Sequence, residues 1–172
     1  LWKLMAETKA AEEPTHLAVI FDAGAITFRN DIYDKYKANR PPLPEELIPQ
    51  FPLIRDAVKA FNVACIEEEG FEADDLIATY ATDIADAGGE VTIVSSDKDL
   101  MQLVRPGISM YDPASGEKKR GSFRAERRIG PDEVMEYFGV PPEKVIDVQA
   151  LAGDATDNVP GVPGIGIKTA AQ

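Results

Sequence analysis

The chain has 172 residues with 18 Lys and Arg against 30 Asp and Glu, and its formal net charge of −12 excludes a protein that coats nucleic acid by bulk positive charge. Hydrophobic residues make up 44%, enough for one substantial core, and no apolar run has the length of a membrane span or the pattern of a signal peptide. The single cysteine, Cys65, excludes an intrachain disulfide and is typical of a reducing compartment. We therefore expect a cytoplasmic protein with no membrane partner.

Both ends of the chain fall inside predicted helices. The chain begins at Leu1 in the middle of one (LWKLMAETKAA) and ends at Gln172 in the opening of another, so we interpret it as a fragment of a longer protein. After the first helix, the apolar and β-branched run from Leu17 to Phe21 predicts a buried strand, with Asp22 at its end.

The middle of the chain alternates predicted helices and strands. A helix is expected over residues 45–61, regular only from about Leu53 because two prolines precede that point. The elements that follow are a strand at 63–66, a helix from Glu72 to the Gly88-Gly89 pair, a strand at 91–94, a short helix at 100–104 and a strand at 108–111. This order predicts an α/β fold with a parallel sheet covered by helices on both faces.

The C-terminal third is richer in loops. Residues 112–128 are polar and hold six of the 18 basic residues, and we expect a mobile loop there. Helices near 131–138 and 142–152 follow, and then a loop over 153–158. The last stretch, 159–169, places Gly and Pro between apolar residues, which favours a hairpin whose N–H groups bind a phosphate; a plain linker is the alternative.

Carboxylates gather where the predicted strands end. Glu72, Asp74 and Asp75 open a helix within four residues and repel one another unless a cation lies between them. Asp22 and Asp97 also follow strands, at the edge where parallel sheets bind ligands. The candidate metal-site residues are Asp22, Glu72, Asp74, Asp75, Asp97, Asp99, Asp154 and Asp157. Singly they can be helix caps or turn residues, but together they lack an obvious matching set of basic partners, which favours divalent ions that hydrolyse a phosphodiester.

A basic and aromatic stretch precedes the first prolines. Its members are Phe28, Arg29, Tyr33, Lys35, Tyr36, Lys37 and Arg40. Such a mixture suits phosphate contacts with base stacking. Taken alone, the stretch is better explained as a solvated helix face with a few aromatic anchors.

Several stretches resemble the 5′-nuclease domain of bacterial DNA polymerase I, a member of the flap-endonuclease family. They are AVIFDAGAITFRND, YKANRPPLPEEL, EGFEADDLIATYA, VSSDKDLMQLV and FGVPPEKVIDVQALAGDATDNVPGVPGIGIKTAA, in the family's order and over most of the chain. The resemblance implies a PIN-like nuclease core over residues 1–152, with a helical arch at about 24–52. It also implies the start of a helix-hairpin-helix at 153–172.

The resemblance further implies phosphodiester hydrolysis that depends on two or more Mg²⁺ or Mn²⁺ ions and removes RNA primers and 5′ flaps in DNA replication and repair. The eight carboxylates would form the metal site, Lys37 and Arg40 would contact the scissile phosphate, and Arg29 and Tyr36 would hold the 5′ strand. Gly164, Gly166 and Lys168 would contact duplex phosphates, with a monovalent cation such as K⁺. The implied partners are DNA with a 5′ flap, nick or RNA primer and a polymerase domain in the same parent chain, which would act as a monomer.

The chain departs from the family pattern in three places. The family's first strand, which ends in an Asp-Gly-Ser-type motif, would precede Leu1; Ile26 stands where many relatives carry lysine; and the basic loop at 115–128 is longer than usual. The main alternative is therefore a module that binds branched DNA without cutting it. An RNA-directed PIN-type nuclease and a small-molecule phosphatase are further alternatives.

Overall fold

The computed structural model describes residues 14–116 and 123–172, so the helix expected at the N-terminus lies outside the described residues. The chain divides into two compact units. The first comprises Leu1–Phe28 and Pro41–Leu76, and the second comprises Arg29–Arg40 and Ile77–Gln172. The chain therefore enters the second unit briefly, returns to the first, and then completes the second.

Two parallel strands form the centre of the first unit. β1 (Ala18–Ile20) pairs with β2 (Ala64–Ile66), and Val19 lies opposite Cys65. Both strands coincide with the short apolar runs that predicted them, but the expectation that the first is buried is wrong, because each strand is exposed at its first residue and half-buried at the other two. A parallel pair needs a crossover between its strands, and α3 is the longer of the two helices in that connection.

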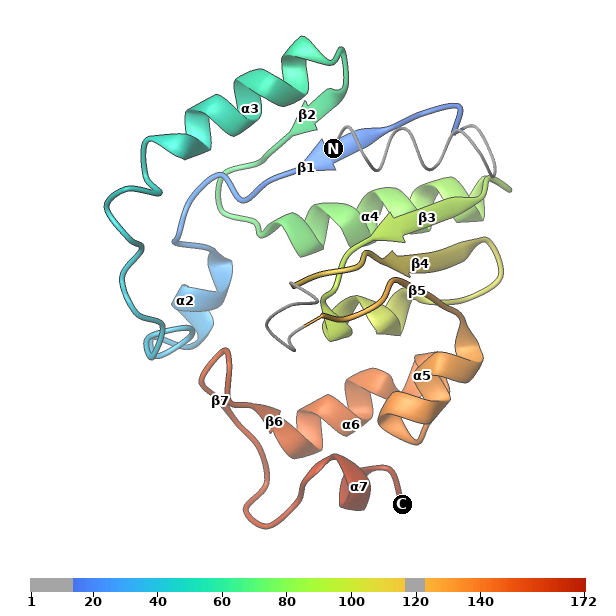
Figure 1. Cartoon of the computed structure of the whole chain (residues 1–172). Helices are drawn as coiled ribbons and strands as arrows, with labels where there is room; N and C mark the ends of the chain where they lie inside the picture. Colours follow the sequence, from blue (N-terminus) through green and yellow to red (C-terminus); the bar gives the residue numbers. More distant parts are fainter. Residues whose placement is uncertain (1–13, 117–122) are drawn as a thin grey trace. The chain divides into compact units, whose positions relative to one another are not determined.

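The helix α3 (Gln50–Ala60) lies beside β2 (Figure 1) and buries Val58. It begins three residues before the expected Leu53. Pro52 does not prevent this, because it lies in the first turn, where helical N–H groups have no intrahelical acceptor in any case.

The helix α4 (Ala73–Asp86) begins and ends close to where the sequence indicates. Its apolar residues recur at helical spacing: Ala81 is buried in the core of the second unit, and Ile77 and Ala85 pack against that core. The helix is followed by Gly88 at φ +85°, a left-handed conformation that costs glycine little because it has no Cβ.

The second unit has a three-stranded sheet. β3 (Val91–Val94) and β4 (Ile108–Asp112) are parallel, whereas β5 (Arg127–Ile129) pairs antiparallel with β4. Its fully buried core side chains come from the sheet, from the 3₁₀ helix between β3 and β4, and from the helices after β5: Met101, Met110, Ile129, Val134, Phe138, Val145 and Val148. The α/β class with parallel strands is confirmed, but the described strands form separate small sheets and β5 adds an antiparallel edge.

The expectation of a mobile loop over residues 112–128 is wrong in part. Residues 117–122 lie outside the described residues, but on either side Ser115 and Arg124 form a backbone bridge, and β5 follows. The carboxylate of Asp112 is fully buried and accepts hydrogen bonds from Arg124 at 2.9 Å and from Arg127 at 3.1 Å. These ion pairs join the two arms of a hairpin whose sequence has no apolar periodicity.

The C-terminal region is helical. α5 (Pro131–Phe138) starts with the Glu133 carboxylate accepting from the Gly130 N–H, and the helix expected at 142–152 is a short 3₁₀ turn, η3 (Pro142–Lys144), that continues as α6 (Val145–Ala152). None of the helices within the described part of the chain is long and apolar enough to cross a membrane.

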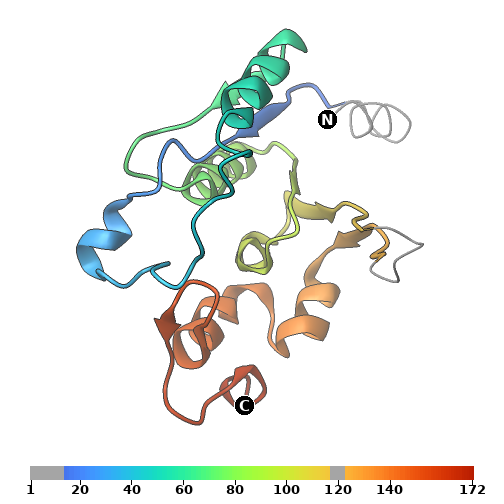
Figure 2. The same ribbon diagram turned by 60° about the vertical axis from the view of Figure 1, so that its left-hand side comes forward.

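A small hairpin and a short helix complete the chain. β6 (Gly153–Asp154) pairs with β7 (Val159–Pro160), and α7 (Ile167–Ala170) packs against α6 (Figure 2). The two backbones meet at Gly153, where an added Cβ would lie 2.2 Å from the Gly161 nitrogen. Only a glycine fits there.

Candidate active site

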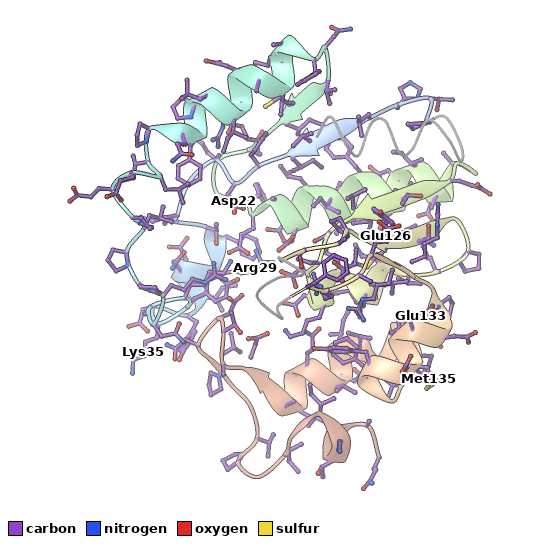
Figure 3. The ribbon with its side chains drawn as sticks, viewed as in Figure 1. Asp22, Arg29, Lys35, Glu126, Glu133 and Met135 are labelled. Carbon is purple, nitrogen blue, oxygen red and sulfur yellow. The ribbon has the colours of Figure 1, made fainter. Side chains whose placement is uncertain are left out.

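In the first unit, the predicted metal-site carboxylates lie at the start of α4. The Asp22 side chain, just after β1, accepts a hydrogen bond from the Ala73 N–H at 2.7 Å, and Figure 3 shows it at this end of the helix. The Asp75 carboxylate accepts from the Glu72 N–H at 2.9 Å, and Glu72 itself is buried. Two carboxylates therefore complement N–H groups that the helix leaves unsatisfied. The cap role named as the alternative is present here.

In the second unit, Asp97 caps the 3₁₀ helix η1 (Lys98–Leu103), because its carboxylate accepts from the Asp99 N–H at 2.9 Å. The next two residues reach across to the end of α6. The Lys98 ammonium donates to Asp99 at 2.7 Å and to Asp154 at 2.5 Å, and the amide of Gln149 donates to Asp99 at 2.5 Å. One cation thus joins two of the predicted metal-site carboxylates.

This arrangement shifts the pKa values of both Asp154 and Lys98. Burial alone would raise the pKa of the Asp154 carboxyl, but hydrogen bonds from Lys98 and from the Thr156 N–H bring the pKa below its usual value. Burial alone would lower the pKa of Lys98, and its hydrogen bonds with Asp154 and Asp99 raise it instead. Both side chains are therefore held in their charged forms at neutral pH.

The basic and aromatic stretch contacts the loop that carries Asp157. Its carboxylate accepts from Arg40 at 2.6 Å and from the Tyr36 hydroxyl at 3.1 Å, and the Lys37 ammonium lies 3.9 Å away. We call this group, Tyr36, Lys37 and Arg40 around Asp157, the arch clasp. It places two predicted phosphate-contacting cations beside a predicted metal-site carboxylate.

The backbone reinforces the arch clasp. The Lys37 N–H donates to the Asp157 carbonyl at 2.9 Å, and Lys37 adopts a left-handed φ of 55°, which is uncommon for a residue with a side chain. The amides of Asn39 and Asn158 add hydrogen bonds to the carbonyls of Ala155 and Lys35. Apart from α2 (Phe28–Ile32), which carries the half-buried Arg29, the expected helical arch is mostly turns up to the start of α3.

The expectation that the carboxylates lack matching basic partners is wrong for three of them. Asp99 and Asp154 share Lys98, and Asp157 pairs with Arg40. Sequence reasoning missed Lys98 and Gln149; the one signal for Lys98 was a lysine between two aspartates in SSDKD.

The donors present fit a divalent cation. Across residues 14–116 and 123–172, no three His, Cys, Asp or Glu side chains gather as a metal-binding group. Asp99 and Asp154 nevertheless surround one ammonium with carboxylate oxygens, which are the donors that Mg²⁺ and Mn²⁺ prefer. The Lys98 ammonium lies between the two carboxylates and pairs with both of them.

The predicted duplex-binding residues lie at the end of the chain. Gly164 has a left-handed φ of 82°, and an added Cβ on Gly164 or Gly166 would meet no atom within 4 Å. Gly166 immediately precedes α7, where Lys168 is exposed. The surface at both glycines is therefore open to another molecule, and their contact with DNA stays a prediction.

Two family models match the chain in succession. Residues 1–139 match the 5′-3′ exonuclease N-terminal resolvase-like domain, and residues 140–172 match the 5′-3′ exonuclease C-terminal SAM fold. The division at residue 152 that the sequence suggested stays a prediction.

Two curated relatives are DNA polymerases I. The one from Rhizobium leguminosarum is 59% identical over 175 residues, and the one from Bacillus caldotenax is 42% identical over 170 residues. These matches cover 100% and 99% of this chain but only 16% and 18% of the relatives. The chain therefore spans less than a fifth of the length of these relatives.

Solved structures of the bacteriophage T5 5′-exonuclease are similar to this chain. The form with bound divalent zinc has a TM-score of 0.79 at 26% identity and covers 99% of this chain and 63% of its own. A T5 flap-endonuclease complex with DNA and metal ions has a TM-score of 0.78 at 25% identity, and the match covers 98% of this chain and 62% of the T5 chain. The catalytic core of Rad2 with DNA, at 16% identity and a TM-score of 0.53, shares the fold.

Proposed function

Because the chain belongs to the 5′-3′ exonuclease family, we propose that it is the nuclease part of a DNA polymerase I that cuts DNA near a 5′ end, at a flap, a nick or an RNA primer. The arch clasp carries this proposal. Asp157 lies 2.6 Å from the Arg40 guanidinium, and Asp154 in the same loop pairs with Lys98. A predicted metal-site loop and predicted phosphate-binding cations are therefore in direct contact within one unit.

We propose that two or more Mg²⁺ or Mn²⁺ ions bind the carboxylates named above, with Asp99 and Asp154 among the residues that hold them. When bound, such ions supply an activated water and stabilise the leaving oxygen of the phosphodiester. Three of these carboxylates also stabilise the starts of helices. Asp22 and Asp75 orient the start of α4, and Asp97 orients η1.

The basic residues of the arch clasp bind the phosphate in this proposal. The Arg40 guanidinium makes a fork of donors suited to phosphate oxygens, and Lys37 adds a positive charge beside the phosphate as negative charge develops on it. Arg29 and Tyr36 hold the 5′ strand. Because Arg40 and Lys37 now face Asp157, a phosphate has to compete with that carboxylate for them.

The C-terminal hairpin binds the duplex in this proposal. The backbone N–H groups near Gly164 and Gly166, with a bound K⁺, and the exposed Lys168 would contact phosphates without reading sequence. The DNA polymerase I relative from Rhizobium leguminosarum, of which this chain covers 16%, supports a polymerase domain in the same parent chain. In this proposal the parent protein is cytoplasmic and acts as a monomer.

A cleavage assay tests the proposal. The parent protein is incubated with a labelled 5′-flap DNA and Mg²⁺, next to the Asp97→Ala variant, and both are tested for DNA binding by fluorescence anisotropy. We expect the parent to release the flap and the variant to bind DNA without releasing it. If the parent binds branched DNA but never cuts it, the chain is a non-cleaving binding module. If an RNA flap is cut in preference to a DNA flap, the proposed DNA substrate is wrong, and an RNA-directed nuclease is favoured.

A further inference from the structure

Lys98 lies among the predicted metal-site carboxylates but has no role of its own in the proposed function. Its ammonium lies between two carboxylates, 2.7 Å from Asp99 and 2.5 Å from Asp154, and its side chain is 32% exposed. Gln149 donates to the same Asp99 oxygen. The ammonium therefore makes two ion pairs at once.

These pairs join elements that are far apart in sequence. Lys98 and Asp99 start η1, whereas Asp154 follows α6, 56 residues later. Two carboxylates that approach one another repel, and the repulsion grows as water is excluded. The Asp154 side chain is 17% exposed, so solvent screens the pair only partly. A cation between the carboxylates removes the repulsion and fixes where η1 meets α6.

The same cation reduces the negative charge that attracts a metal. Asp99 and Asp154 carry two negative charges, and Lys98 leaves a net charge of one. A divalent ion that binds Asp154 has to displace the ammonium or share the carboxylate with it. Displacement breaks the two ion pairs of Lys98, and sharing places two positive charges at short distance, so either outcome weakens binding.

We propose that Lys98 is an internal counter-ion of the Asp99–Asp154 pair, which keeps the two carboxylates together before metal binds and lowers their affinity for a divalent ion. The inference rests on the proposed function, because it assumes that these carboxylates are metal ligands. It adds a residue that sets how tightly the metal is held. An ion that is held weakly at this position leaves and returns readily, and its occupancy then follows the free metal concentration.

The test uses the longer parent protein without DNA, and "the parent" below means that protein without any substitution. Mg²⁺ binding is measured by isothermal titration calorimetry for the parent and for Lys98→Met, which keeps an unbranched side chain, one atom shorter, and removes its charge. Lys98→Arg keeps the charge, and Lys144→Met removes a lysine from an exposed pair with Asp147. We expect Lys98→Met to bind the ion about tenfold more tightly, as removal of one nearby positive charge predicts, and the other two variants to bind like the parent.

A second readout separates this role from an ordinary structural one. Without metal, Lys98→Met should have a lower Tm than the parent, and excess Mg²⁺ should close most of that gap, because the ion then does what the ammonium did. Lys98→Gln, which keeps an N–H₂ group that can donate to a carboxylate, replaces Lys98→Met if the latter does not fold, with the same expected gain in affinity.

The inference fails if the neutral variant binds Mg²⁺ with the same or lower affinity than the parent, or if excess Mg²⁺ leaves the gap in Tm unchanged. It can fail alone: a parent that cuts flap DNA while Lys98→Met binds Mg²⁺ normally refutes the counter-ion and leaves the nuclease standing. A parent that neither binds Mg²⁺ nor cuts flap DNA refutes the proposed function, and the inference with it.

Discussion

Replacement of Asp112 by asparagine should destabilise the second unit strongly. The carboxylate is fully buried, and Arg124 and Arg127 both donate to it. Asn keeps the shape of the side chain but removes its charge, and an amide N–H₂ has to face one of the guanidinium groups. Loss of one partner of a buried ion pair costs about 3–5 kcal/mol. The two arginines are 44% and 42% exposed, so solvent screens part of the attraction, and we expect about 2–3 kcal/mol.

Calorimetry and hydrogen exchange measure this effect. For a chain of this length, about 2–3 kcal/mol corresponds to a Tm lower by roughly 4–12 °C. The backbone bridge between Ser115 and Arg124 should also lose protection from exchange, because the ion pairs join the arms of that hairpin. Asp86→Asn is the matched control: its pair with Arg105 is exposed on both sides and should matter by less than about 1 kcal/mol. Equal losses in the two variants would refute the reasoning.

Three further predictions concern the site. Lys37→Ala should lower the turnover of flap DNA more than its binding, since the charge it stabilises forms during cleavage; single-turnover kinetics check this, and weaker binding at normal turnover would contradict it. The folded-state pKa of Asp154 is depressed, so its contribution to stability is present above about pH 4 and disappears as the pH falls through the lower folded value. Asp154→Asn should therefore flatten the acid limb of the plot of urea-unfolding free energy against pH, and an unchanged limb would contradict it. Gly153→Ala should cost about 3 kcal/mol, because its Cβ would overlap Gly161 at a φ of +72°, whereas Gly164→Ala, strained only in φ, should cost about 1 kcal/mol in the same denaturant titration.

The regular elements were predictable because their signals are local. α4 combines helical spacing of its apolar residues with glycines after its last turn, and both the helix and its end are as expected. The strands β1 and β3 are short apolar runs bounded by polar residues, which suffices to locate them. Each of these signals lies within about fifteen residues, so one sequence contains all of it.

The strand β5 and the ion-pair partners of the carboxylates could not be predicted, because they depend on contacts between charged residues that are far apart in the sequence. β5 is the sequence RRI, which no hydrophobic pattern marks as a strand; it pairs with β4, buries Ile129, and donates from Arg127 to the buried carboxylate of Asp112. The candidate carboxylates of the site were predicted from their motifs, and their role stays a prediction. Their partners were not predicted, since the contact of Lys98 with Asp154 spans 56 residues and that of Arg40 with Asp157 spans 117. Periodicity carries no information at such separations.

The arch clasp also has a consequence for how the chain folds. Tyr36 and Asp157 are 121 residues apart, so their hydrogen bond closes one of the longest loops in the chain. The entropy lost on closing a loop rises with its length, and contacts of this kind form after local helices and nearby strands. The contacts of the clasp are polar and partly exposed, with Arg40 half exposed, so little apolar burial opposes their opening. The segment 29–40 should therefore join the second unit last during folding and leave it first, in brief openings that never unfold the sheet.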